Sequence, residues 1–328
     1  MPDGETTRQG RVLRSAAALR KAGLISAEAE AAAAEVGARY AISVTGHVAG
    51  LIDPSDAADP IALQYLPDAR ELVTAPGEMD DPTADAPFTP VKGVVHRYPD
   101  RALLKPLLAC PVYCRFCFRR EVVGPDGGTL TEAELEAALA WFEATPAVRE
   151  AVLTGGDPFM LSSRRLGAIL ARLGAVPHIE TLRVHTRVPV ADPARVDGTL
   201  VEALRRAGKP VFVAVHANHA REFSGAAVAA LARLAEAGVP LLGQSVLLRG
   251  VNDSPAALEA LVRAMIRARV RPYYLHALDP APGVSRFAVP DAEGVALVEA
   301  LRGRVPGFAV PVFVRERPAG GGKRPVSG

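Results

Sequence analysis

Short apolar runs alternate with longer amphipathic segments along most of the chain. The apolar runs are rich in Val, Leu and Ala and are bounded by polar turns, a pattern typical of buried strands. They fall at residues 102–108, 150–154, 181–187, 211–216, 240–248, 271–276 and 308–314. The amphipathic segments between them show helical periodicity and fall at residues 131–145, 163–173, 199–209, 225–238, 254–270 and 291–304.

The succession of six strand–helix units predicts a parallel sheet with helices on its outer face. Right-handed crossovers make such a sheet curl in one sense. Six units are fewer than a closed eightfold barrel needs. We therefore expect an α/β fold built on a partial (β/α)6 TIM-like barrel.

Local signals at the helix ends support these assignments. Thr131 is followed by Glu134, which is the spacing of a capping box. Ser254 stands before Pro255, which predicts a helix that begins with a serine cap and a proline at its first position.

The N-terminal part has a different pattern. Residues 15–40 are rich in Ala and Glu with helical periodicity, and the Pro- and Asp-rich stretch that follows predicts short helical pieces. We predict a mostly helical extension over residues 1–90, the barrel over residues 91–317 and a C-terminal tail over residues 318–328.

Composition narrows the class of protein. The 38 basic and 36 acidic residues give a net charge of +2, which provides no electrostatic footprint for nucleic acid. The first ten residues are polar and contain no apolar signal region, and no apolar run is long enough to span a membrane. We expect a cytoplasmic protein with no nucleic-acid or membrane partner, and the sequence leaves a homo-oligomer open.

All three cysteines lie within eight residues, as Cys110, Cys114 and Cys117. This crowding and the odd number argue against a disulfide framework and favour a metal site in a reducing compartment. Three thiolates in one loop can hold a [4Fe-4S] cluster and leave one iron open for a small molecule. Zinc is the weaker alternative because structural zinc sites use four ligands and no second cysteine pair exists. Unreactive thiols are weaker still.

Polar residues follow each predicted strand, where ligands bind in parallel sheets. Gly155, Gly156 and Asp157 follow the second strand, and glycines there allow a backbone to approach a ligand closely while an exposed carboxylate holds an ammonium. Taken alone, the motif is more simply interpreted as a tight strand–helix turn. His216 and His219 lack an obvious third ligand, so they are interpreted as polar pocket lining rather than as a metal site.

Two further motifs flank the barrel. Arg97 and Arg101 stand on either side of Tyr98 and can clamp a phosphate, or can be ordinary surface charge. Lys323 follows a run of three glycines near the C-terminus. A lysine can form a Schiff base with an aldehyde cofactor, and flexible glycines would let it swing inward, although a polar tail is the simpler interpretation.

The chain resembles the lysine 2,3-aminomutases of the radical S-adenosylmethionine superfamily. The resemblance runs from about residue 91 to the end, in the right order. It rests on VHRYPDRALL, CPVYCRFCFRR, LTGGDPF, HTRVPV, HANH, GQSVLLRGVND, RPYYLHALD and PAGGGKRPV. Length, YYLHALD and VRE make the chain most similar to the short branch typified by the elongation factor P lysine 2,3-aminomutase.

The resemblance implies an isomerase that converts L-lysine to β-lysine by 2,3-amino migration. It also implies a [4Fe-4S] cluster, S-adenosylmethionine, pyridoxal 5′-phosphate and an external reductant. The cysteines would bind the cluster, the Gly155–Gly156–Asp157 motif the methionyl amine, and Lys323 the pyridoxal cofactor covalently. The cofactor phosphate would lie at Arg97, Tyr98 and Arg101.

For the substrate, the resemblance places Arg119 at its carboxylate, and Asp279 and Glu316 at its side-chain ammonium. Paired acids suit a cationic substrate, because a buried ammonium needs opposite charge nearby. A glutamate-specific relative would carry basic or amide residues there. Glu316 departs from the Asp that free-lysine enzymes usually have, and the tail leaves little structure to hold Lys323.

Two alternatives stay open. One keeps the radical chemistry but acts on arginine or another basic amino acid. The other is a non-catalytic iron–sulfur electron carrier or sensor, which would not need Lys323 or the two arginines around Tyr98.

Overall fold

The computed structural model describes residues 12–124, 128–317 and 322–327. Within these residues nine strands form one sheet, in the order β1 to β9 along the chain. Strands β2 to β8 are parallel to one another. They are β2 (Arg101–Leu107), β3 (Glu150–Gly155), β4 (Thr181–Thr186), β5 (Val211–His216), β6 (Leu241–Val246), β7 (Arg271–His276) and β8 (Val312–Arg317).

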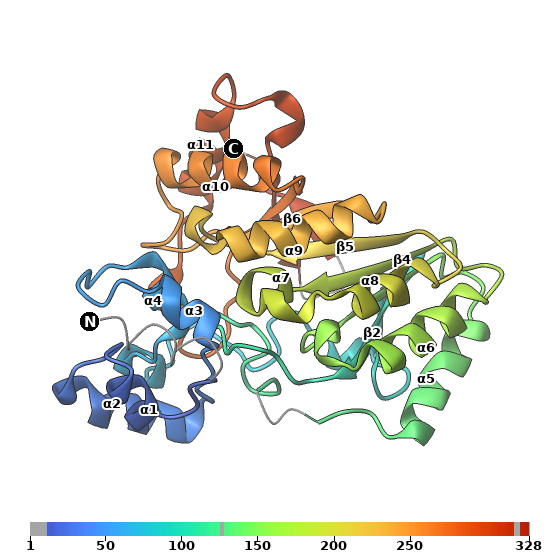
Figure 1. The fold of residues 1–328 in the computed structure, drawn as a ribbon, viewed down its shortest axis with the longest axis horizontal. Helices are drawn as coiled ribbons and strands as arrows, with labels where there is room; N and C mark the ends of the chain where they lie inside the picture. The colour runs from blue at the N-terminus through green and yellow to red at the C-terminus, as the bar shows by residue number, and fades with distance from the viewer. Residues whose placement is uncertain (1–11, 125–127, 318–321, 328) are drawn as a thin grey trace.

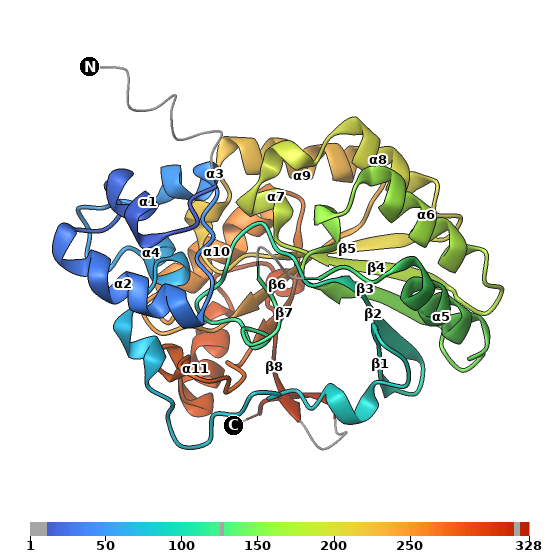
Figure 2. The same ribbon diagram turned by 90° about the horizontal axis from the view of Figure 1, so that it is seen from below.

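The crossover helices lie outside the curved sheet, as the alternating pattern predicts (Figures 1 and 2). They are α5 (Glu132–Glu143), α6 (Ser163–Gly174), α8 (Gly198–Arg205), α9 (Gly225–Glu236), α10 (Pro255–Arg267) and α11 (Asp291–Leu301). The short helix α7 (Val188–Ala191) follows β4. Thr131 and Glu134 form the expected capping box of α5, and Ser254 caps α10 ahead of Pro255. The partial (β/α)6 barrel is therefore confirmed.

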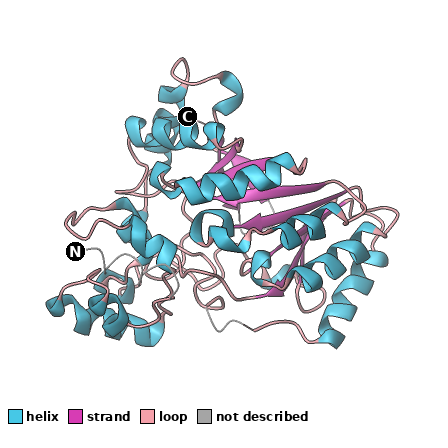
Figure 3. Cartoon of the chain, in the orientation of Figure 1, coloured by secondary structure: helices cyan, strands magenta, loops and turns pink. Residues whose placement is uncertain are grey.

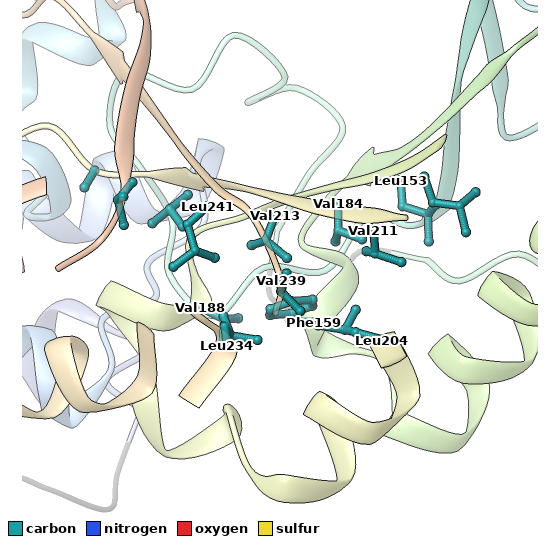
Figure 4. Close-up of a cluster of buried hydrophobic side chains, with 14 of the residues drawn as sticks. Leu153, Phe159, Val184, Val188, Leu204, Val211, Val213, Leu234, Val239 and Leu241 are labelled. Carbon is teal, nitrogen blue, oxygen red and sulfur yellow. The ribbon is translucent and has the colours of Figure 1, made fainter. Parts of the chain in front are cut away.

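Alternation along the strands puts one side of the sheet against the helices. Leu153 of β3 lies beside Val184 of β4 in the ladder, and both are fully buried. Figure 4 shows these side chains with Val213 of β5 above Leu204 and Leu234 of the outer helices. Burying each such side chain contributes about 2 kcal/mol, so this layer holds the sheet in shape while its other side stays available for a site.

Two antiparallel strands extend the ends of the sheet. β1 (Val94–Tyr98) pairs with β2, and β9 (Gly322–Pro325) pairs with β8. Neither strand is apparent from the apolar pattern, because both are rich in polar residues. The expectation that the tail leaves Lys323 unsupported is wrong, since β9 holds it in a ladder.

The last parallel strand begins later than its apolar run suggests. Residues 307–309 form a 3-10 turn, and β8 starts at Val312. Pro306 and Pro311 explain the shift, because proline fixes φ and has no N–H for a ladder.

The N-terminal extension is helical at first and irregular later. Its helices are α1 (Ala16–Lys21), α2 (Ala27–Arg39), α3 (Gly46–Leu51) and α4 (Pro60–Tyr65), drawn in blue in Figure 1 and visible as helix in Figure 3. Two 3-10 turns, η1 (Ala69–Leu72) and η2 (Ala86–Phe88), lead to β1. The helices enclose a hydrophobic cluster that also buries Val112, from the segment that carries the cysteines. The division of the chain at residue 90 stays a prediction.

None of the helices in the described ranges has the length and apolar character that a membrane span requires.

Candidate active site

A cavity of about 610 Å³ lies on the concave side of the sheet. This volume is in the range of small-molecule and cofactor sites. The cavity collects every site residue that the sequence singled out for a ligand: Arg97, Tyr98, Arg101, Cys110, Cys114, Cys117, Arg119, Gly155, Gly156, Asp157, Asp279, Glu316 and Lys323. These residues come from distant parts of the chain, so their convergence is a property of the fold.

The three cysteines lie in the loop after β2 and line one part of the cavity. Burial raises the pKa of all three thiols, and it raises that of Cys117 to about 11. Metal binding must therefore displace protons from them. No three His, Cys, Asp or Glu side chains in the described residues are grouped to hold a single metal ion. A four-iron cluster needs no such grouping, because each cysteine binds a different iron.

A buried ion cluster fixes the cysteine loop to the extension. Glu71, on η1, accepts hydrogen bonds from Arg115 at 2.6 and 2.9 Å and also from Arg120. The side chains of Glu71, Arg115 and Arg120 are fully buried. Arg286 lies 3.6 Å from Glu71 and forms a closer ion pair with Asp68 at 3.0 Å. Because Arg115 and Arg120 flank Cys117 in sequence, the extension takes part in shaping the loop.

Backbone contacts add to this attachment. The Tyr113 N–H donates to the carbonyl of Ser43, and the Arg115 N–H donates to that of Gln64. The Ser43 hydroxyl in turn donates to the carbonyl of Pro111 at 3.1 Å. The extension and the cysteine loop thus form one continuous scaffold.

The paired glycines are required by close packing. Gly155 has φ of +113°, and a Cβ there would lie 2.6 Å from the carbonyl oxygen of Leu107. A Cβ on Gly156 would lie 2.2 Å from the carbonyl oxygen of Ala109. The Gly156 and Asp157 N–H groups donate to the carbonyls of Leu107 and Ala109. The glycine loop is therefore pressed against the residues directly before Cys110.

Asp157 lines the cavity but is not the exposed carboxylate expected from sequence, because it is only 3% exposed. Its oxygens accept hydrogen bonds from the Thr186 hydroxyl at 2.7 Å and from the Arg187 and Val188 N–H groups at 2.6 and 3.2 Å. The carboxylate thus joins the loop after β3 to the start of α7. The role of this segment toward a methionyl amine stays a prediction.

Arg187 is a cavity residue that the sequence reasoning missed. Its Nη1 lies 3.5 Å from the Cys114 sulfur, and its Nη2 donates to Glu222 at 2.6 Å and to Gln64 at 2.7 Å. The HTR motif after β4 was the signal that could have drawn attention to it. A buried guanidinium here places positive charge beside the cysteine triad.

Lys323 enters the cavity from β9. Its partner across the β8–β9 ladder is Glu316, and its Nζ lies 3.7 Å from that carboxylate. Its N–H donates to the Tyr98 hydroxyl at 2.6 Å, which links β9 to β1. Burial lowers the pKa of Lys323, and the nearby charge of Glu316 opposes this. Gly320 and Gly321, expected to make the tail flexible, lie outside the described residues.

The Arg97–Tyr98–Arg101 segment spans the seam between the two ends of the sheet. Arg97 forms an ion pair with Glu316 at 2.9 Å and donates to the carbonyl of Arg317 at 3.0 Å. The Arg101 guanidinium stacks on the Tyr98 ring at 4.3 Å. Of the two arginines, Arg101 is therefore the freer to meet a phosphate, while Arg97 is held by a carboxylate.

Two acids face this end of the cavity. Burial and the neighbouring Glu316 charge raise the pKa of Asp279 to about 6, while Lys323 opposes the rise. Two buried carboxylates that repel each other accept a cation readily. The structure brings Asp279 and Glu316 together on the cavity wall, and their role toward a substrate ammonium stays a prediction.

The histidines that line the cavity are half-buried residues whose surroundings disfavour the charged form. Burial lowers the pKa of His185 and His216 well below the usual value and that of His276 to about 3. His216 therefore lines the cavity as polar wall, as expected. His219 instead caps a 3-10 turn, accepting a hydrogen bond from the Arg221 N–H.

Several buried nitrogens on the cavity wall have no hydrogen-bond partner within the described residues. They are the donors Arg97 Nε, Arg183 Nε and Arg187 Nε. Buried donors of this kind are normally paired, so the wall suits ligands that carry phosphate and carboxylate oxygens.

A curled parallel sheet with a three-cysteine loop at the carboxyl end of its first parallel strand defines a radical S-adenosylmethionine enzyme, and the radical SAM superfamily profile matches residues 104–261. Within that superfamily the chain belongs to the lysine 2,3-aminomutase family. It is 40% identical to the L-lysine 2,3-aminomutase of Clostridium subterminale, over 87% of this chain and 68% of that protein.

Other relatives cover similar shares of the chain. The L-lysine 2,3-aminomutase of Escherichia coli is 39% identical over 79% of this chain and 75% of that protein. The glutamate 2,3-aminomutase of Clostridioides difficile is 32% identical over 89% of this chain and 69% of that protein. Identities of 40% and 39% do not separate the branches of the family, so placement in the short branch stays a prediction.

Solved structures agree on the fold. The structure of Streptococcus suis SuiB bound to S-adenosylmethionine has a TM-score of 0.50 and 14% identity, and the match covers 67% of this chain and 51% of that one.

The superfamily uses a [4Fe-4S] cluster and S-adenosylmethionine, and lysine aminomutases also use pyridoxal 5′-phosphate. The residues present fit these groups. The cavity offers three cysteines in one loop, a lysine whose pKa is lowered by burial, and unpaired buried donors suited to oxyanions.

Proposed function

We propose that this protein converts L-lysine to β-lysine by moving the 2-amino group to carbon 3. One observation carries the proposal: the cysteine triad, Lys323, the acid pair formed by Asp279 and Glu316, and Arg119 all line the same cavity. A carrier of electrons would not need the last three features.

The chain's residues divide the work of holding the cofactors. Cys110, Cys114 and Cys117 hold the cluster, and the Gly155–Gly156–Asp157 segment meets the methionyl amine. Lys323 binds the pyridoxal cofactor covalently, with Arg101, Tyr98 and Arg97 toward its phosphate. When bound, these groups would supply the radical that removes a hydrogen atom and a ring system that delocalises the resulting unpaired electron while the nitrogen migrates.

The acid pair selects the substrate side chain. In the structure Glu316 has two cationic neighbours, Arg97 at 2.9 Å and the ammonium of Lys323 at 3.7 Å. A lysine committed to a cofactor no longer supplies that charge, and the ε-ammonium of the substrate takes its place between Asp279 and Glu316. The carboxylate of a glutamate side chain would be repelled there, which favours lysine over glutamate.

Arg119 binds the α-carboxylate at the opposite end. A planar guanidinium can donate two parallel hydrogen bonds to a carboxylate, and this fixes orientation as well as affinity. Holding both ends of lysine presents its second and third carbons to the reacting groups and keeps water away from them.

The test is an anaerobic assay of the reconstituted holoenzyme with lysine, arginine or glutamate, an external one-electron reductant and S-adenosylmethionine. Accumulation of β-lysine that stops in Cys117→Ala supports the proposal. Turnover of arginine instead would show the same chemistry on another basic amino acid. Formation of 5′-deoxyadenosine without any β-amino acid would overturn the choice of substrate. A protein that binds a redox-active cluster but no pyridoxal phosphate would favour a carrier or sensor.

A further inference from the structure

Asp85 reaches the cavity wall from the extension and touches the arginine proposed to bind substrate. It lies just before η2, and one of its carboxylate oxygens, Oδ2, accepts hydrogen bonds from Arg119 Nη2 at 3.1 Å and Arg119 Nε at 3.3 Å. Both residues line the cavity, and their side chains are 12% and 14% exposed. Nothing in the sequence pattern pointed to this contact.

A second cation shares the same carboxylate. Lys105 of β2 donates to Asp85 Oδ2 at 3.4 Å, while the Thr83 hydroxyl donates to the other oxygen at 3.2 Å. Asp85 is thus held by three side chains. The charges of Arg119 and Lys105 keep the pKa of Asp85 below its usual value although burial acts to raise it.

We propose that Asp85 is a positioning residue that orients Arg119 toward the carboxylate of the amino-acid substrate, and that Lys105 offsets the charge of Asp85. The inference deepens the proposed function and rests on the proposed role of Arg119.

The orienting role of Asp85 follows from which edge of the Arg119 guanidinium it contacts. Asp85 occupies the edge formed by Nε and Nη2, and within the described residues Nη1 has no hydrogen-bond partner. The guanidinium also lies 4.4 Å from the centre of the Phe118 ring, which restricts its tilt. A guanidinium fixed along the Nε–Nη2 edge still offers Nη1 and the second N–H of Nη2 to another carboxylate, with little loss of side-chain entropy.

The role of Lys105 follows from the net charge of the cluster formed by Asp85, Arg119 and Lys105. Asp85 alone would cancel the charge of Arg119, and the pair would attract an anion weakly. With Lys105 the three groups carry one net positive charge. Lys105 does not line the cavity, so its contribution is to the field and not to contact.

The test separates position from charge in the pyridoxal-loaded holoenzyme. Affinity is measured from the change in pyridoxal absorbance on adding lysine or lysinamide, which lacks the carboxylate. Asp85→Asn combined with Lys105→Met keeps the net charge of the cluster at one positive unit but removes the orienting carboxylate. We expect the ratio of lysine affinity to lysinamide affinity to be roughly tenfold smaller in this double variant than in the wild-type protein. Its affinity for lysinamide should stay within about twofold of wild type.

Single variants and controls complete the design. Lys105→Met alone should weaken lysine binding several-fold and leave lysinamide unchanged. Asp85→Glu, which keeps the charge but moves it by one methylene, should give an intermediate loss and guards against misfolding of the double variant. Asp253→Asn is the matched control, because Asp253 pairs with Arg249 at 3.0 Å outside the cavity. Iron content and S-adenosylmethionine affinity should stay at wild-type values throughout.

The outcomes distinguish a failure of the inference about Asp85 from a failure of the proposed role of Arg119. If the wild-type protein prefers lysine to lysinamide and Arg119→Lys abolishes this, the role of Arg119 stands, and an unchanged preference in both Asp85 variants would overturn the inference. If the wild-type protein shows no preference, Arg119 does not bind the substrate carboxylate, and the proposed role and the inference fail together.

Discussion

Lys323 stands directly opposite Glu316 in the β8–β9 ladder, with its Nζ 3.7 Å from the carboxylate. Opposite residues in an antiparallel pair point to the same side of the sheet, so this register delivers both groups to the cavity. The Tyr98 hydroxyl accepts the Lys323 N–H and ties the strand to the other end of the sheet. The lysine proposed to bind the cofactor and the acid proposed to bind the substrate are therefore placed by one local element.

Replacing Lys323 by Ala should abolish covalent binding of pyridoxal phosphate and lower turnover by at least a thousandfold, roughly the scale for losing a covalent catalytic group. Borohydride reduction followed by peptide mass spectrometry detects the covalent adduct. Arg324→Ala, at the exposed neighbouring position, is the control and should keep both properties. An adduct that persists in Lys323→Ala would show that another lysine binds the cofactor.

Asp279 should make the apoprotein less stable as pH rises. Its pKa is raised to about 6 from 3.8, so between about pH 4 and pH 6 the unfolded chain loses its proton before the folded protein does. The contribution of Asp279 to the free energy of unfolding is largest below pH 4 and falls by about 3 kcal/mol at most by pH 6. Urea unfolding across this range, compared with Asp279→Asn, measures it. A wild-type-minus-variant difference that does not change with pH would contradict the raised pKa.

Substrate binding should depend on pH in the opposite sense. The ε-ammonium of lysine binds the ionised form of Asp279, so affinity should fall as pH drops below about 6, by at most roughly tenfold per pH unit. Asp279→Asn should bind lysine weakly and with little dependence on pH between 5 and 7. Equal pH profiles for the two proteins would show that Asp279 is not a ligand of the ammonium.

Gly156→Ala should reduce the iron content and the stability of the protein together. The new Cβ would lie 2.2 Å from the carbonyl oxygen of Ala109, which precedes Cys110. Relief of such a clash costs about 1–3 kcal/mol and displaces the cysteine loop. Gly225→Ala is the matched control, since its Cβ would meet no atom within 4 Å at the start of α9. Iron analysis and thermal unfolding report the two effects, and normal iron content in Gly156→Ala would refute the coupling.

Glu71→Gln should destabilise the protein by about 3–5 kcal/mol, because it leaves the buried arginines Arg115 and Arg120 without their anion. Glu136→Gln removes an exposed ion pair with Arg172 and should change stability by less than about 1 kcal/mol. Denaturant unfolding measures both. A small loss for Glu71→Gln would show that the buried ion cluster contributes little to holding the cysteine loop on the extension.

Much of the fold was predictable from sequence because it depends on local regularities. Apolar runs and period-3.6 patterns identify buried strands and outer helices, and the right-handed crossover gives the sheet one sense of curl. Capping at Thr131 and Ser254 follows the same logic, since a cap and its helix are neighbours in the chain. The cysteine triad could also be identified from sequence, because its three ligands lie within one loop.

The tertiary structure decided which distant side chains meet. The contacts of Asp85 with Arg119, of Glu71 with Arg115 and of Arg187 with Glu222 join residues 34, 44 and 35 positions apart and leave no periodic signal. Strand β9 was missed because its pairing surface is polar and its stability comes from β8 and Tyr98 rather than from its own composition. The sequence by itself thus determined the scaffold and the reactive loop, which arise from short-range periodicity and spacing. Only the folded chain determined how charges are paired around the cavity, because electrostatic partners are chosen by distance in space.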